Sequence, residues 1–193
     1  LTEMHRQRKE VFIDQLRWPL EHSAGLEIDA YDSAEAIYLI EAETQSAKIS
    51  ASARLLPTTR PHLLGDLFAD LCAAPPPRGP DVWEATRFCP APETPSGQER
   101  RAMLGRIIAA IMETALLFGI QRVTYVADAA LAPMARAAGW SAEALGPPKG
   151  RGRARLQAFV ADIDAAGLRR VREVHGIAAP LTRFAPGDLV RAA

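Results

Sequence analysis

The chain has 193 residues, of which 48% are hydrophobic and 24% charged, a composition that predicts a globular domain with its own core. Lysine plus arginine and aspartate plus glutamate both number 23, so the net charge is zero and gives no reason to expect a nucleic-acid or membrane-surface partner. Cys72 and Cys89 are far apart, which argues against a disulfide framework or zinc site and favours a reducing cytoplasm.

No apolar run approaches the ~20 residues that a membrane span needs, so neither a spanning helix nor a signal peptide is expected. The sequence begins at Leu1 instead of a methionine, which leaves open a short upstream segment. Apolar residues recur at helical spacing in five stretches. The predicted helices cover residues 3–16, 62–72, 98–118, 130–138 and 165–174. The third is the longest, and Gly119 is suited to end it.

Short apolar and β-branched runs predict five strands between these helices. They cover residues 36–42, 47–56, 82–88, 122–127 and 155–163. Residues 43–46 fit a hairpin turn, and residues 176–193 contain two prolines and are expected to be a loosely structured tail. This order of elements predicts a single α/β domain over residues 1–193 with a mixed sheet.

Four blocks of residues carry more specific information. They are Arg8-x3-Phe12-x5-Trp18 with Glu27-x-Asp29-x-Tyr31-Asp32; Arg54-Leu-Leu-Pro-Thr-Thr59 with Pro61, Leu64 and Phe68; Trp83-Glu84-x-Thr86-Arg87-Phe88; and Ala138-Gly139-Trp140. In order and spacing they resemble the LuxI-type autoinducer synthases, and the resemblance runs from about Arg8 to Val160.

The resemblance implies a GNAT-like acyltransferase fold, in which a twisted mixed sheet flanked by helices holds an acyl-thioester cleft. It implies an acyl-homoserine-lactone synthase that transfers an acyl group from an acyl carrier protein or coenzyme A to the amine of S-adenosylmethionine (SAM). Lactone closure then releases methylthioadenosine. SAM and the thioester are substrates, so no metal or cofactor is implied. Residues 1–32 would form an N-terminal lobe that covers the SAM site.

Glu84 is the candidate general base, acting through a water, because it lies on a short strand among bulky apolar neighbours. Burial would raise its pKa and nearby arginines would lower it. A structural role, in which Glu84 pairs with Arg54 or Arg87, stays open. Strand alternation places Glu84, Thr86 and Phe88 on one face, so Arg87 would reach that face only at a bulge or splay.

The resemblance also marks residues that bind substrate or hold the lobe above it. They are Arg8, Phe12, Trp18, Asp29, Asp32, Arg54, Thr86, Arg87 and Phe88. Arginines and aspartates of this set form either ligand contacts or an architectural ion-pair network. Arg8 on pattern alone is a solvated helix residue and Phe12 a core aromatic. Trp18, beside Pro19, has an indole face suited to cover an adenine or a sulfonium.

Acyl specificity is predicted to depend on the strand over residues 122–127. Family members that make 3-oxo signals tend to carry a threonine there, where this chain has Tyr125 with Thr124 beside it. A tyrosine would shorten the pocket and favour a short, branched or aromatic acyl group. Met103, Ile107 and Ile111 complete the candidate acyl pocket, although all four residues fit an ordinary core equally well.

Basic clusters are candidates for docking the acyl carrier protein or the phosphates of coenzyme A. They comprise Arg100, Arg101, Lys149, Arg151 and Arg153, each of which is otherwise a solvated loop or helix residue. The phosphate-binding turn of GNAT enzymes is incomplete here, because Met103 stands in place of its first glycine.

Two other functions fit these residues less well. One is a GNAT-type N-acyltransferase for a different amine, against which the incomplete turn argues. The other is a non-catalytic protein that binds SAM or an acyl carrier, against which the joint presence of Glu84, Arg54 and Arg87 argues.

Overall fold

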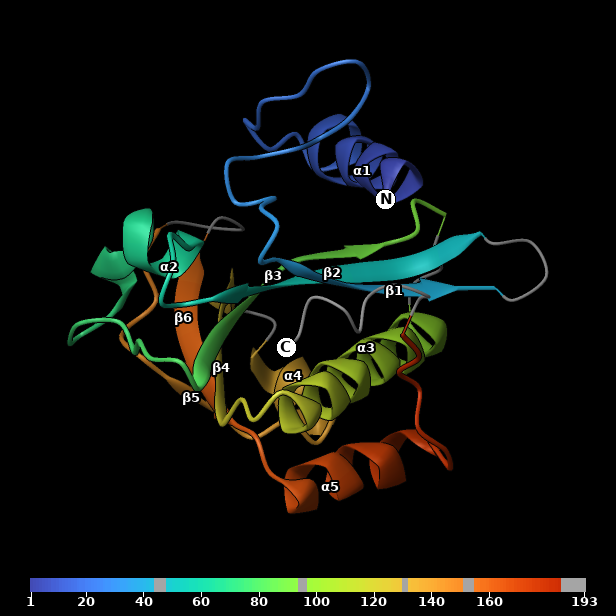
Figure 1. The fold of residues 1–193 in the computed structure, drawn as a ribbon, viewed down its shortest axis with the longest axis vertical. Helices are drawn as coiled ribbons and strands as arrows, with labels where there is room; N and C mark the ends of the chain where they lie inside the picture. The colour runs from blue at the N-terminus through green and yellow to red at the C-terminus, as the bar shows by residue number, and fades with distance from the viewer. Residues whose placement is uncertain (44–47, 94–96, 130–131, 151–154, 185–193) are drawn as a thin grey trace.

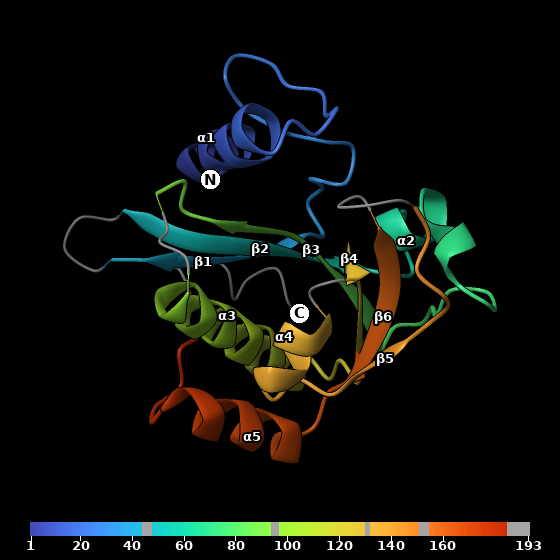
Figure 2. The ribbon, with the colours of Figure 1, turned by 180° about the vertical axis from the view of Figure 1, so that it is seen from behind.

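The computed structural model describes residues 1–43, 48–93, 97–129, 132–150 and 155–184. Its frame is a six-stranded sheet in the order β1-β2-β3-β4-β6-β5 (Figures 1 and 2). The strands are β1 (Ile37–Ala42), β2 (Ile49–Pro57), β3 (Val82–Pro90), β4 (Arg122–Asp128), β5 (Ala142–Ala144) and β6 (Leu156–Asp162). Only β3 and β4 pair in parallel among these strands, so the sheet is mixed, as predicted.

Helices cover both faces of the sheet. They are α1 (Thr2–Arg8), the π-helical η1 (Lys9–Gln15), α2 (Leu63–Asp66), the 3-10 turn η2 (Ala69–Leu71), α3 (Gln98–Leu117), α4 (Ala132–Ala137) and α5 (Ala165–His175). In both views α1 lies over one face near β2 and β3, α3 lies against the other face, and α5 packs outside α3 (Figures 1 and 2). None of the described helices is both long and apolar enough to cross a membrane.

The middle of the sheet divides into two parts. Residues 82–85 of β3 pair with residues 122–125 of β4, and beyond Ala85 and Tyr125 no pairing joins the described residues of these two strands. From there β3 continues beside β2 alone, and β4 continues beside β6. The sheet therefore opens where the backbones of Ala85 and Tyr125 stop pairing.

The two faces of the sheet have different cores at this opening. Successive strand residues point to opposite faces, so Glu84 and Ala85 point apart, and Tyr125 shares the face of its partner Ala85. Ala85 and Tyr125 pack against the core that contains Met103 and Ile107 of α3. Glu84 faces the other way, toward the backbone of α2. We call these the α3 face and the α2 face.

Where the structure describes them, most predicted elements are confirmed within two residues, but one predicted helix is wrong and one strand was missed. The helix expected over residues 62–72 consists of two short pieces, α2 and η2, because the chain leaves helical geometry at Phe68. This break lets Leu64, Phe68 and Leu71 pack together against β6. The edge strand β5 was not predicted, since three residues are too few to show a strand pattern.

The segment after α5 contacts α3. Gly176 ends α5 in the left-handed conformation (φ 64°), and no helix or strand follows up to Phe184. The Glu113 carboxylate of α3 accepts hydrogen bonds from the backbone N–H of Leu181 (2.9 Å) and Thr182 (2.8 Å), and from the Thr182 hydroxyl. Glu113 also pairs with Arg172 of α5, so one partly buried carboxylate joins this segment to two helices.

Candidate active site

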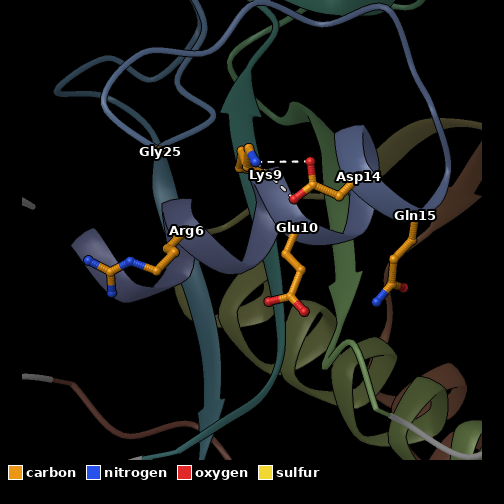
Figure 3. Close-up of a pocket in the computed structure, with 6 residues that line it drawn as sticks. All are labelled: Arg6, Lys9, Glu10, Asp14, Gln15 and Gly25. Atoms are coloured by element: carbon orange, nitrogen blue, oxygen red, sulfur yellow. Dashed lines mark hydrogen bonds and ion pairs between the residues drawn. The ribbon is translucent and has the colours of Figure 1, made fainter.

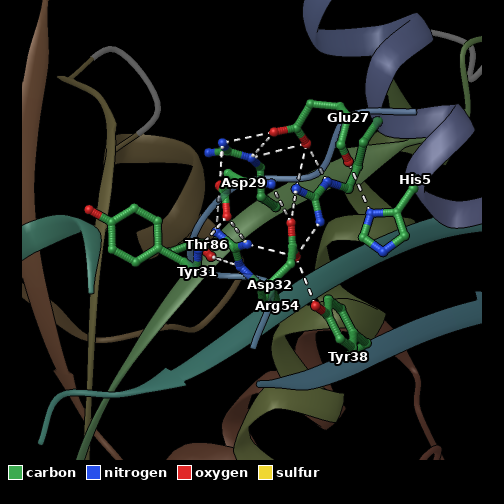
Figure 4. Close-up of polar contacts among 10 residues, drawn as sticks. His5, Glu27, Asp29, Tyr31, Asp32, Tyr38, Arg54 and Thr86 are labelled. Atoms are coloured by element: carbon green, nitrogen blue, oxygen red, sulfur yellow. Dashed lines mark hydrogen bonds and ion pairs between the residues drawn. The ribbon is translucent and has the colours of Figure 1, made fainter. Parts of the chain in front are cut away.

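A network of buried ion pairs fixes the N-terminal segment to the sheet (Figure 4). Its cations are Arg8, Arg54 and Arg87, and its anions are Glu27, Asp29 and Asp32. The cations come from α1, β2 and β3, while the anions come from the loop that precedes β1. Three charges of each sign balance one another, as buried charges require.

Arg8 of α1 is buried, with 1% of its surface exposed. Its guanidinium forms a bidentate pair with Asp32 (2.8 and 2.9 Å), and its Nε donates to Glu27 at 2.5 Å. Burial alone would raise the pKa of Asp32, but hydrogen bonds from Arg8 and the Asp29 backbone, with the charge of Arg54, hold it well below its usual range. The alternative that Arg8 is a solvated helix residue is therefore wrong.

Arg54 of β2 is fully buried and forms a second bidentate pair, with Asp29 (2.6 and 3.0 Å). Its Nε donates to the Thr86 hydroxyl at 3.0 Å, which places Thr86 on the same face. Burial would lower the pKa of Arg54, but Asp29 and Asp32 raise it above its ordinary value. Arg54 is therefore a charged residue whose hydrogen-bonding groups are used within the protein.

Arg87 joins this network through a β-bulge. Residues 87 and 88 of β3 together stand opposite Ala53 of β2, between the pairs Arg54–Thr86 and Ser52–Cys89. Arg87 has φ 51°, in the left-handed region that few non-glycine residues adopt. The bulge turns its guanidinium to Glu27 (3.0 Å) and Asp29 (2.7 Å), on the face of Thr86. The expectation that Arg87 reaches this face only through a bulge is confirmed.

Glu84 lies apart from these pairs, buried on the α2 face. It is 1% exposed, its Oε1 accepts the Leu64 backbone N–H at 2.9 Å, and its Oε2 has no hydrogen-bond partner within the described structure. Burial raises the pKa of Glu84 to about 7, against the opposing effects of the Leu64 and Leu63 amides and of Arg54. Arg54 and Arg87 make their ion pairs with the other carboxylates, so Glu84 is not paired in the way the structural alternative supposed.

Two aromatic residues lie beside the network. Phe12 is buried and stacks on Trp18 with ring centroids 4.9 Å apart and an interplanar angle of 5°. The Arg87 guanidinium carbon lies 5.9 Å from the centre of the Phe12 ring. Trp18 remains 46% exposed, and Phe88, at the bulge, is 36% exposed. Phe12 is thus a core residue, and a ligand role for Trp18 and Phe88 stays a prediction.

The candidate acyl pocket lies on the α3 face. Tyr125 stacks between Trp140 (5.0 Å) and Phe159 (5.1 Å), directly at the opening of the sheet. Burial raises the pKa of the Tyr125 phenol to about 12, so the ring is neutral. The remaining pocket candidates, Met103, Ile107 and Ile111, are buried members of the main core. The structure thus brings all four residues to one face.

The described basic residues considered for carrier docking lie on α3 and on the loop before β6. Arg100 and Arg101 are exposed in the first turn of α3, and Lys149 is exposed and pairs with Asp70 at 3.2 Å. Arg151 and Arg153 lie outside the described residues. A docking role for these residues remains a prediction.

Several site residues were missed as candidates although they belong to the sequence blocks or their neighbourhood. Glu27 is 1% exposed and binds both Arg8 and Arg87. Tyr38 of β1 donates its hydroxyl to Asp32 at 2.8 Å, and His5 hydrogen-bonds the Glu27 carbonyl (Figure 4). Glu27 could have been chosen as a candidate from the sequence, because it belongs to the Glu-x-Asp-x-Tyr-Asp block. Tyr38 could not, because its position showed only the pattern of a strand residue.

A surface pocket also opens on the outer side of the first helical segment (Figure 3). Its lining residues are Arg6, Lys9, Glu10, Asp14, Gln15 and Gly25. It shares none of them with the ion-pair network or Glu84, and its Lys9–Asp14 pair is solvent-exposed, so this pocket is separate from the candidate site. Cys72 and Cys89 are free thiols, and no three His, Cys, Asp or Glu residues of the described chain are arranged to hold a metal.

Comparison with known proteins agrees with this geometry. The sequence profile of the autoinducer synthase family matches residues 1–171. An acyl-homoserine-lactone synthase from Ralstonia solanacearum is 33% identical over 189 residues, covering 95% of this chain and 89% of the relative. BjaI, a CoA-dependent acyl-homoserine-lactone synthase solved with SAM and isopentyl-CoA, is 26% identical with a TM-score of 0.85, covering 96% of this chain and 86% of BjaI.

TofI, solved in a ternary complex with an inhibitor and MTA, is 31% identical with a TM-score of 0.76, covering 88% of each chain. A putative N-acetyltransferase from Lactobacillus plantarum, 12% identical with a TM-score of 0.55, shares the fold alone, in agreement with the expected GNAT-like arrangement. The chain belongs to the autoinducer synthase family, and it is an acyltransferase of the acyl-homoserine-lactone synthase type.

Proposed function

We propose that the enzyme transfers an acyl group from acyl-coenzyme A to the amine of SAM and then closes the homoserine lactone, with Glu84 as the general base. One observation carries the proposal: a buried, unpaired carboxylate lies on β3, next to the point where β3 and β4 separate. A general base works best with a pKa near the operating pH, and burial raises the pKa of Glu84 to about 7.

The first step makes an amide. Glu84, acting through a water molecule, takes one proton from the SAM ammonium, and the free nitrogen attacks the thioester carbonyl carbon. The new N–C bond forms as the C–S bond breaks, and the second nitrogen proton goes to the departing thiolate. No enzyme nucleophile is needed, in keeping with the burial of Cys89, which raises the pKa of its thiol to about 12.

The second step makes the lactone. The SAM carboxylate attacks the γ-carbon, the bond from that carbon to the sulfonium breaks, and neutral methylthioadenosine leaves. The negative charge of the carboxylate and the positive charge of the sulfonium are both lost, and both products are neutral, so this step needs no further proton transfer. The protein's contribution is to hold the two ends of the substrate close together.

The division of the sheet supports a placement for the two substrates. SAM would lie on the α2 face beside Glu84, under the lobe of residues 1–32. The thioester would enter where β3 and β4 cease to pair, with its acyl group directed to Tyr125 on the α3 face. The network arginines would act mainly by fastening the lobe, because their guanidinium groups already bind Glu27, Asp29 and Asp32. The partly exposed Trp18 indole would cover the substrate cation.

Coenzyme A is proposed over an acyl carrier protein as the carrier of the acyl group. The support is the similarity to BjaI, a CoA-dependent synthase solved with a short-chain acyl-CoA. The exposed arginines of the first α3 turn provide positive charge for its phosphates.

The test is turnover of Glu84→Gln with SAM and an acyl-CoA, followed by release of thiol and of methylthioadenosine. Glutamine keeps the acceptor for the Leu64 amide but cannot take a proton, so we expect a loss of roughly 10²–10⁴-fold in kcat. Glu93→Gln, an exposed carboxylate paired with Lys48, is the matched control and should retain activity. Near-normal turnover in Glu84→Gln would remove Glu84 from the base role.

A further inference from the structure

The Glu84 carboxylate depends on the first turn of α2 for its only hydrogen-bonding contacts within the described chain. Leu64 N–H donates to Oε1 at 2.9 Å, and the Leu63 amide also favours the charged carboxylate. Because α2 has four residues, it has little helical stability of its own. The direction of these amides must therefore be set by whatever holds the start of α2.

His62 immediately precedes α2 and is 3% exposed. Its Nδ1 lies 2.8 Å from the Arg60 carbonyl oxygen. Since a carbonyl only accepts, Nδ1 carries the proton and donates it, which anchors the ring. The second ring nitrogen, Nε2, is buried and has no partner in the described structure.

The anchored His62 ring lies directly against Gly65. A Cβ placed at Gly65 would stand 2.7 Å from His62 Cε1 and 2.8 Å from Nε2, distances that real side chains do not tolerate. Gly65 has no positive φ, so the missing side chain serves this close approach and not an unusual backbone conformation. Because the ring is buried and its Nδ1 is hydrogen-bonded to Arg60, moving it away would disturb that hydrogen bond.

We propose that His62 and Gly65 are positioning residues for the reaction: their contact fixes the first turn of α2 and thereby keeps the Leu64 N–H on the Glu84 carboxylate. The proposal rests on the proposed role of Glu84 as the base. Neither residue need touch the substrate, since both act through the backbone of residues 63 and 64.

The contact should therefore control the pH at which Glu84 becomes a base. Arg54 from β2 and the two α2 amides favour its charged form, whereas burial and Asp66 of α2 oppose it, and Tyr31 of the N-terminal loop also lies within its electrostatic reach. If the amides turn away, one favourable contribution is lost and the acid limb of the rate profile moves to higher pH.

The test is a double-mutant cycle of Gly65→Ala and His62→Ala, read as the pH dependence of methylthioadenosine release. Gly65→Ala should move the acid limb up by about one pH unit. With a starting pKa of about 7 for Glu84, this is roughly a fivefold loss at pH 7 that disappears above about pH 9. His62→Ala should produce a similar shift, and Gly65→Ala should add nothing in that background, because the ring it would strike is gone.

Gly105→Ala is the matched control. Its Cβ would lie 2.3 Å from the His175 ring, so it crowds a helix as severely, but on α3 instead of α2. It should lower stability and leave the acid limb in place. If Gly65→Ala does not fold, the test rests on His62→Ala alone. An unchanged acid limb in the rate profile of that variant would overturn the proposal.

Titration of the Glu84 carboxyl carbon by NMR in 13C-glutamate-labelled protein separates this proposal from the proposed function. An additive cycle, or an unshifted Glu84 titration in the variants, would overturn the positioning role even if Glu84 is the base. Conversely, a shifted carboxyl titration with an unchanged rate profile would show that His62 and Gly65 hold Glu84 but that Glu84 does not limit the reaction.

Discussion

Arg87 Nη2 and Glu27 Oε1 lie 3.0 Å apart, and this contact exists only because β3 is bulged at Arg87. Regular alternation would have turned the guanidinium to the opposite face of the sheet. The left-handed backbone at Arg87 is an unfavourable conformation for this residue, and its ion pairs with the N-terminal loop oppose that cost. The strained backbone of β3 at Arg87 is therefore coupled to the attachment of the N-terminal segment to the sheet.

Loss of Glu27 should destabilise the fold strongly. Glu27→Gln leaves Arg8 and Arg87 buried with one anion fewer, and breaking a buried pair in this way costs about 3–5 kcal/mol. Asp14→Asn removes an exposed pair with Lys9 and should cost about 0.5 kcal/mol or less. Urea unfolding of both variants measures the difference. Equal effects would mean that the network does not fasten the lobe.

Glu84→Gln should alter stability in a pH-dependent way. The folded pKa of Glu84, about 7, lies above its unfolded value, so the stability linked to its protonation is complete below that unfolded value and is lost as pH rises through about 7. Glutamine stays neutral, and the variant should gain about 1–3 kcal/mol over the parent at pH 8 but little at pH 5. Thermal unfolding of the parent and the variant at pH 5 and pH 8 tests this. The same difference in stability at both pH values would contradict a raised pKa for Glu84.

Tyr125 should limit the length of the acyl group. Tyr125→Phe keeps the stack with Trp140 and Phe159 and should preserve the acyl preference. Tyr125→Thr removes the ring at the sheet opening and should shift kcat/KM toward longer acyl-CoA substrates by about tenfold or more. Rates with a series of straight-chain acyl-CoAs measure the change. An identical ranking in all three proteins would show that the ring does not face the acyl chain.

Glu113 should hold residues 181 and 182 against α3. Burial opposes its charge, but hydrogen bonds from Arg172 and Thr182 hold the pKa of Glu113 below its ordinary value, so this stabilisation is present above the unfolded pKa and lost as pH falls through the lower folded one. Glu113→Gln should cost about 1–3 kcal/mol and speed hydrogen exchange at the Leu181 and Thr182 amides. Glu173→Gln, exposed on α5, serves as the control, and equal exchange in both variants would refute the anchor.

Much of the fold followed from local patterns. The apolar face of α3, with Ile107, Ile108 and Ile111 buried, has the regular spacing from which a helix is readily predicted. The strands on either side of it were likewise recognisable from their composition. In contrast, the break at Phe68 and the short strand β5 depend on contacts with β6, which no local pattern encodes.

The candidate site was only partly predictable, for a related reason. The sequence blocks contained Arg8, Asp32 and Arg54, but their mutual pairing depends on a loop folding back over the sheet. Periodicity made Arg8 look solvated, although its helix buries this one charged side chain. Whether burial or the nearby arginines dominate the pKa of Glu84 also could not be predicted from the sequence. The structure shows that burial dominates, because Arg54 and Arg87 pair with other carboxylates.

The central claim is best tested by incubating the purified chain with SAM and acyl-coenzyme A substrates and analysing the products by mass spectrometry. We predict that an acyl-homoserine lactone and methylthioadenosine form in equal amounts and that both are lost together in Glu84→Gln. An acylated amine formed without methylthioadenosine, or binding of SAM with no product from coenzyme A or carrier-protein thioesters, would contradict it.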